Sequence, residues 1–99
     1  MKVNVETPGF DADVKLIQFI EKRLTKLEHF YDRITHVDVF LRVEKTKPAN
    51  KLIEVLVNVP GDEFMCKKMA KSFEEGVDLC AESLERVVKK HKQKIRAKA

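Results

Sequence analysis

Apolar residues occupy every second position in two segments, 37–43 and 53–59, and this pattern constrains the fold more than any other feature of the chain. Successive side chains of a strand point to opposite faces of a sheet, so both segments are predicted to be strands with one buried face. A shorter alternation predicts a first strand over 2–7, and a weaker one predicts a fourth strand over 63–70. Pro60-Gly61 suits a hairpin turn, because proline presets φ and glycine accepts a positive φ. The chain is therefore expected to form a four-stranded sheet, with a loop over 46–51.

Two segments with helical periodicity can cover one face of this sheet. Asp13 is a suitable N-cap for a helix that extends to about Tyr31, with apolar residues at helical spacing. Ser72-Phe73-Glu74-Glu75 is a capping box that opens a last helix, whose apolar stripe ends at Ile95 and includes His91. The order β-α-β-β-β-α predicts an α+β fold with strands one and two parallel and both helices on one sheet face. The other face is expected to be open and to include Asp38, Phe40, Arg42, Glu54 and Asn58.

Length and composition fit one domain, residues 1–99. Apolar residues make up 43% of the chain and charged residues 36%, as in a globular domain with a heavily charged surface. No apolar run approaches the roughly 20 residues that span a bilayer, and the N-terminus lacks the layout of a signal peptide, so the cytoplasm is the expected compartment. Cys66 and Cys80 form no CxxC pair and are expected to be reduced packing residues there.

Charge is distributed unevenly along the chain. The formal net charge is +4, but the segment 86–99 contains no acidic residue, so all 16 acidic residues lie in the preceding body. A body with an acidic excess and a basic extension over 86–99 is typical of a protein that binds a polyanion. Basic residues also favour the C-terminal end of a helix through its dipole, but that effect covers only the last turn, whereas this run covers about three turns. The pattern favours binding.

Catalytic and metal-binding patterns are missing from the sequence. No glycine-rich loop follows a predicted strand, which argues against a nucleotide fingerprint. His29, His36 and His91 fall in different predicted elements and show no metal-ligand spacing with cysteine. His91 is expected to be a partly buried packing residue. We therefore expect no enzyme activity, no metal and no cofactor.

Three segments together resemble a known family. Lys26-Leu27-Glu28-His29-Phe30-Tyr31-Asp32-Arg33-Ile34 is similar to the family's signature at the end of its first helix. Arg42-Val43-Glu44-Lys45 resembles the end of its second strand, and the segment 84–95 resembles its basic last helix. On these motifs the chain resembles the short form of the ribosome hibernation promoting factors, also called the sigma-54 modulation or light-repressed family. One departure is Ser72-Phe73-Glu74, where some members carry Asp-Met-Tyr.

The resemblance implies a fold similar to double-stranded-RNA-binding domains and a role as a translation inhibitor. It implies binding to the rRNA of the small ribosomal subunit in the decoding region, where the protein blocks mRNA and tRNA and promotes hibernation in stress or stationary phase. It also implies a monomer that depends on a separate ribosome modulation factor to pair ribosomes, since the chain ends directly after the basic helix. The residues carried over by position are Arg23, Lys26, Arg42, Lys45, Arg86, Lys90, Lys92 and Lys94. Lys22 and Lys89 are added as basic neighbours on physical grounds.

Two other functions remain open at this point. A generic structured-RNA-binding domain would carry the same charge pattern, and charge alone does not separate it from a ribosome-specific protein. The second is a modulator of an alternative sigma factor, a function that rests only on the family's older name. A small enzyme that uses the open sheet face is disfavoured, because no constellation of site residues is present.

Overall fold

The computed structural model describes residues 1–45, 48 and 50–98, with side chains described as far as residue 96. Three residues of the predicted 46–51 loop, at positions 46, 47 and 49, lie outside the described residues, and Lys51 already belongs to the third strand. The chain forms the strands β1 (Lys2–Glu6), β2 (His36–Val43), β3 (Lys51–Val59) and β4 (Asp62–Ala70). It forms the helices α1 (Val14–Thr25) and α2 (Phe73–Lys98), and a short 3-10 helix, η1 (Lys26–His29).

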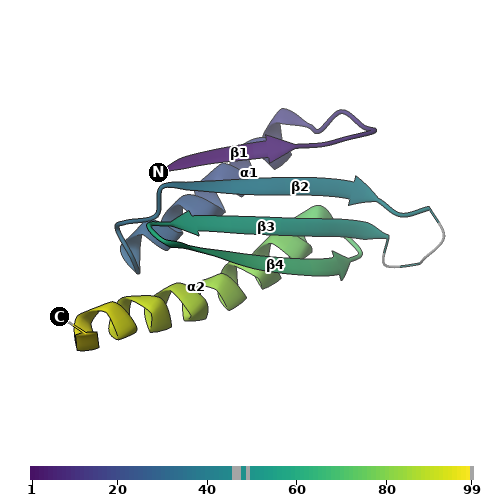
Figure 1. The fold of residues 1–99 in the computed structure, drawn as a ribbon. Helices are drawn as coiled ribbons and strands as arrows, with labels where there is room; N and C mark the ends of the chain where they lie inside the picture. Colours follow the sequence, from purple (N-terminus) through teal and green to yellow (C-terminus); the bar gives the residue numbers. More distant parts are fainter. Residues whose placement is uncertain (46–47, 49, 99) are drawn as a thin grey trace.

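The sheet follows the predicted topology, with the strand order β1-β2-β3-β4 (Figure 1). β1 is parallel to β2, while β3 is antiparallel to both β2 and β4. Gly61, between β3 and β4, has a φ of +80°, so the predicted Pro60-Gly61 turn forms at the position where positive φ is needed. The predicted four-stranded α+β fold is confirmed.

Both helices cover one face of the sheet, and the core lies between the two layers. Val37, paired with Val3 on one side and Val57 on the other, is completely buried, as is Val55 on the same face. The helices contribute the buried residues Ile20 and Leu24 from α1, and Val77, Cys80, Leu84 and Val88 from α2. The period-two and helical patterns of the sequence therefore meet in a single hydrophobic core.

The helix caps form as the sequence predicts. Asp13 precedes α1, and its carboxylate accepts a hydrogen bond of 3.0 Å from the Lys15 amide. Ser72 precedes α2, and its hydroxyl accepts a hydrogen bond of 3.2 Å from the Glu75 amide. Each cap provides a partner for an amide that the helix itself leaves unpaired, and so fixes where the helix begins.

The first helix ends earlier than the sequence predicts. The predicted helix extends to about Tyr31, but α1 ends at Thr25 and the chain continues through η1. The Thr25 hydroxyl donates to the Glu21 carbonyl, an arrangement that loosens and bends helices. The tighter winding continues to Phe30, whose amide donates to the Leu27 carbonyl at 3.0 Å. Leu27 and Tyr31 are still buried, so the predicted apolar stripe is correct although its helix type is not.

α2 approaches the sheet closely at Gly76. A methyl group on this residue would overlap the Ile53 side chain on β3, with the Ile53 Cγ1 atom only 2.7 Å away. Gly76 therefore serves close packing between helix and sheet, and it does so without a positive φ. The close contact between α2 and β3 at this point therefore depends on a glycine at position 76.

The sheet face turned away from the helices carries mixed charge. Register places Phe40 opposite Glu54, and Arg42 opposite Leu52, on this face, as the sequence predicts. Asp38 accepts a hydrogen bond of 3.0 Å from the Asn4 side chain, and Lys67 lies 3.8 Å from the Glu54 carboxylate. Acidic and basic groups both occur on this face and are interspersed with apolar side chains, so it is a poor polyanion-binding surface. None of the helices in the described part of the chain is both long and apolar enough to span a membrane.

Candidate nucleic-acid interface

The second half of α2 carries half of the predicted binding residues. α2 contains 26 residues and is about 39 Å long at 1.5 Å per residue, whereas the nine residues of β4 span only about 31 Å. The end of α2 consequently projects beyond the sheet (Figure 1). Its cations are exposed except for Lys92, which is half-buried. They are Arg86, Lys89, Lys90, Lys92, Lys94 and Arg96.

These cations occupy two flanks of the helix. Lys90 and Lys94 lie on the flank nearer β4, where they line a pocket together with Asp62, Phe64 and His91. Lys89 and Lys92 lie on the opposite flank, beside η1. Lys90 and Lys94 thus share one flank, and the cations of this segment occupy both flanks of the helix.

The cations of α1 and η1 belong to the same helical layer. Lys22, Arg23 and Lys26 line a shallow pocket of about 200 Å³ together with Phe19. Lys22 and Arg23 belong to the last turn of α1, where positive charge is favoured by the helix dipole. Lys22 and Lys26 are exposed, as binding residues must be.

Arg23 has a structural partner. Its Nε atom donates to Asp78 Oδ1 on α2 at 3.0 Å, and the side chains are 23% and 50% exposed respectively. This pair joins α1 to α2, so Arg23 positions the two helices as well as contributing charge to the surface. Arg23 is predicted from the sequence only as a binding residue, because a partner 55 residues away gives no local signal.

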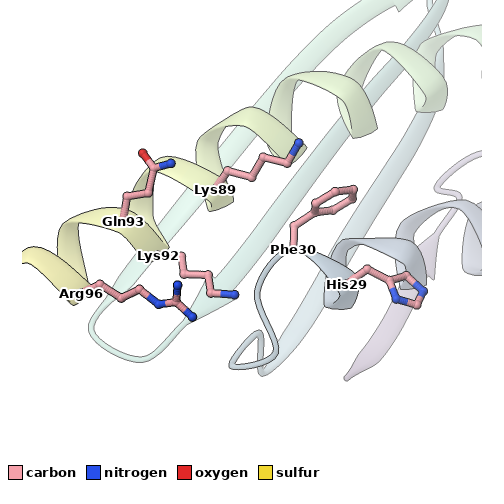
Figure 2. Close-up of a pocket in the computed structure, with 6 residues that line it drawn as sticks. All are labelled: His29, Phe30, Lys89, Lys92, Gln93 and Arg96. Carbon is pink, nitrogen blue, oxygen red and sulfur yellow. The ribbon is translucent and has the colours of Figure 1, made fainter.

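Phe30 and Lys89 meet where η1 approaches α2. The Lys89 ammonium lies 4.5 Å from the centroid of the Phe30 ring, within cation–π range. The same ammonium lies 3.4 Å from the Glu85 carboxylate, one turn earlier in α2. Phe30 and Lys89 line a pocket of about 280 Å³ (Figure 2), together with His29, Lys92, Gln93 and Arg96. Phe30 and Arg96 are not among the predicted binding residues, although Arg96 lies four residues after Lys92, on the same helix flank.

Arg42 and Lys45 lie at the other end of the molecule. They border a pocket formed with the turn after β1, which includes Gly9 and Phe10. The Phe10 ring stacks on Phe73, the first residue of α2, with the centroids 5.2 Å apart. The first turn of α2 is about 24 Å from Lys89, at 1.5 Å per residue. The predicted binding residues therefore do not form one cluster: five lie on the second half of α2, Arg23 lies beside Asp78 nearer the start of that helix, and Arg42 and Lys45 lie at the far end.

The remaining candidate groups take packing roles. His91 is half-buried between Tyr31 and Phe64, in edge-on contacts with centroid distances of 5.3 and 5.2 Å, as expected. Both cysteines are free, and Cys80 is completely buried with its Sγ atom 3.7 Å from the Cys66 carbonyl oxygen. Burial, followed by the interaction with the neighbouring Cys66 thiol, raises the pKa of the Cys80 thiol, which keeps it neutral and unreactive. Within residues 1–45, 48 and 50–98, no three His, Cys, Asp or Glu side chains are grouped to hold a metal ion.

The sequence of the chain matches a known family. The family model described as "Sigma 54 modulation protein / S30EA ribosomal protein" matches residues 3–96. The chain belongs to this family. Its relatives include the ribosome hibernation promoting factor of Azotobacter vinelandii, 34% identical over 95% of this chain and 85% of the relative. The ribosome hibernation promoting factor of Escherichia coli K12 is 27% identical over 97% of this chain and 98% of the relative.

Two solved structures share the fold of this chain. A ribosomal subunit interface protein from Coxiella burnetii superposes with a TM-score of 0.82 at 22% identity, covering 94% of this chain and 99% of that protein. The N-terminal domain of Thermus thermophilus Protein Y superposes with a TM-score of 0.76 at 20% identity, covering 91% and 94% respectively. At these identities the likeness establishes the β-α-β-β-β-α architecture.

Proposed function

We propose that this protein binds the rRNA of the small ribosomal subunit in the decoding region and promotes ribosome hibernation by blocking mRNA and tRNA. The observation that carries the proposal is the gathering of exposed cations at one end of the helical layer, where the second half of α2 projects past the sheet. The mixed charge of the open sheet face supports the helical face as the contact surface. The relatives named ribosome hibernation promoting factors support the ribosome as the partner.

The proposed mechanism is occupancy. Guanidinium and ammonium groups bind phosphate oxygens, release counterions and fix the position of the protein without reading sequence. Folded RNA is recognised largely by shape, which suits a rigid face built from two packed helices. Once bound, the protein excludes mRNA and tRNA because it occupies their space. Arg42 and Lys45, at the far end of the molecule, would hold a second, separate RNA contact.

Sedimentation with salt-washed subunits tests this proposal. The protein should pellet with small subunits and not with large ones, and an excess of unrelated double-stranded RNA should fail to displace it. If six or more phosphates are contacted, affinity should fall on the order of a thousandfold between about 50 and 200 mM salt. Displacement by the unrelated RNA would instead support a generic structured-RNA-binding domain. Equal binding to both subunits would contradict the proposed site, and recovery of a sigma factor without ribosomes would favour the transcriptional alternative.

We further propose that the protein acts as a monomer and that pairing of ribosomes needs a separate ribosome modulation factor. Like charge on the last turns of α2 opposes self-association through the helical face. The purified protein added to salt-washed ribosomes should produce no dimer peak on centrifugation until that factor is supplied. A dimer peak with this protein alone would contradict the proposal.

A further inference from the structure

The pocket between η1 and α2 combines an aromatic ring with several cations (Figure 2). Its volume of about 280 Å³ lies just below the range of about 300–1,000 Å³ that is usual for small-molecule sites, so it has room for one flat group. Lys92 and Arg96 reach from α2 towards η1, and the Phe30 ring lies under Lys89. The pocket therefore offers a stacking surface with positive charge on one side of it.

Phe30 and its neighbour Tyr31 have different surroundings. Tyr31 is 4% exposed and packs edge-on against His91 in the core. Phe30 is half-buried, and one face of its ring is occupied by the Lys89 ammonium at 4.5 Å. Phe30 also packs against the core, so the face under Lys89 is covered by a flexible lysine side chain. The negative face of the ring is therefore available to another flat or cationic partner.

Lys89 can leave the ring without losing its ionic partner. Its ammonium already lies 3.4 Å from the Glu85 carboxylate. Lysine side chains reorient about several rotatable bonds, so the ammonium can turn towards Glu85 or towards an incoming phosphate. Exchange of Lys89 for a ligand on the Phe30 ring therefore leaves no buried charge unpaired.

We propose that this pocket receives one unpaired RNA base, stacked on the Phe30 ring, with its adjacent phosphates held by Lys92 and Arg96. The inference rests on the proposed function and adds to it the chemical class of the ligand. Bases within a duplex are stacked on one another and cannot reach an aromatic ring, whereas bulged, looped or terminal bases can. Stacking of a base on an aromatic side chain tolerates any sequence and strengthens binding by about 5- to 150-fold.

Substitutions at Phe30 test the stacking directly. Phe30→Leu keeps an apolar side chain against the core but removes the ring, and Phe30→Trp restores an aromatic surface. With salt-washed small subunits as the ligand, Phe30→Leu should weaken binding by about 5- to 150-fold, and Phe30→Trp should stay within a few-fold of the native protein. The thermal midpoint of each variant, measured alone, serves as the control for folding.

The salt dependence separates stacking from phosphate binding. Stacking releases no counterion, so Phe30→Leu should leave the slope of log affinity against log salt unchanged. Lys92→Gln and Arg96→Gln should each reduce that slope by about 0.7–0.9. An unchanged affinity for Phe30→Leu would overturn the inference while leaving the proposed function intact. A reduced slope of log affinity against log salt for the same variant would do so as well. Failure of the native protein to bind small subunits would instead reject the proposed function itself.

Two RNA hairpins identify the ligand as a base. One contains a single bulged adenine, and the other is fully paired and otherwise identical. The native protein should prefer the bulged hairpin at least fivefold, and Phe30→Leu should remove that preference while keeping the affinity for the paired hairpin. Loss of subunit binding by Phe30→Leu without any preference of the native protein for the bulged hairpin would assign the pocket to a ribosomal protein contact and overturn the inference.

Discussion

Arg23 on α1 donates a hydrogen bond of 3.0 Å to Asp78 on α2, so a residue expected to bind RNA is held by a carboxylate of the same chain. The pair joins two helices that together carry half of the chain's lysine and arginine residues. It also neutralises part of the charge that Arg23 would otherwise present to a polyanion. Arg23 is therefore a positioning residue first, and its contribution to binding is reduced by its partner.

Separating these two roles of Arg23 needs a double-mutant cycle with Arg23→Gln and Asp78→Asn. Denaturant unfolding should give a coupling free energy of about 0.2–1 kcal/mol, since both side chains are partly solvated. In binding to small subunits, Asp78→Asn should increase affinity because it frees the guanidinium, whereas Arg23→Gln should decrease it. Equal losses of affinity in both single variants would show that Arg23 acts only by holding the helices together.

Charge reversal at Lys26 and at Arg86 tests the two helical contributions separately. Both side chains are exposed, so Lys26→Glu and Arg86→Glu should each change the free energy of unfolding by no more than about 0.5 kcal/mol. Each should weaken binding to small subunits on the order of tenfold at about 0.1 M salt for every phosphate that the variant no longer binds.

A matched control for these reversals is Lys67→Glu, which makes the same change in net charge. Lys67 is exposed and lies on the open sheet face, on the other side of the sheet from the gathered cations. Its reversal should leave subunit affinity close to that of the native protein. Equal weakening by all three variants would show that overall charge, rather than the helical surface, determines binding.

Close packing of α2 on β3 makes Gly76 sensitive to a single methyl group. Alanine has the higher helix propensity by about 1 kcal/mol, but its methyl group would overlap the Ile53 side chain. Over-packing should dominate, so Gly76→Ala is expected to destabilise the protein by about 1–3 kcal/mol. Ile53→Val should partly relieve the overlap, and the double variant should be more stable than the sum of the two single changes predicts. A stabilised Gly76→Ala variant would mean that the helix lies farther from the sheet.

The raised pKa of the Cys80 thiol predicts how stability depends on alkaline pH. In the folded protein burial keeps the thiol protonated, while in the unfolded chain it ionises near the ordinary cysteine pKa of 9.0. Its contribution to stability is complete below pH 9.0 and decreases above it, by at most about 1.36 kcal/mol per pH unit. Denaturant unfolding under reducing conditions should therefore show a steeper alkaline loss for the native protein than for Cys80→Ala. Parallel curves for the two proteins would contradict this assignment.

Local patterns in the sequence were sufficient to predict the sheet, the helix caps and the sheet face that the helices cover. Alternation in 37–43 and 53–59 fixed which side chains point to the core, because a strand offers only two faces. Asp13 and Ser72 marked helix starts because a cap depends on residues within one turn. The end of α1 at Thr25 was not predicted, because the apolar spacing through Tyr31 fits both an α-helix and the tighter 3-10 winding that replaces it.

The sequence by itself determined that this protein has one sheet, two covering helices and a basic end, since each depends on residues close together in the chain. Only the tertiary structure decided how the charged residues are grouped. It paired Arg23 with Asp78, separated Arg42 and Lys45 from the helical cations, and placed Phe30 beside Lys89 while Tyr31 entered the core. The physical reason is that contacts between elements depend on how the helices cross the sheet. How the helices cross the sheet depends on packing across the whole core. This packing involves residues from every element, so it cannot be read from any single segment of the sequence.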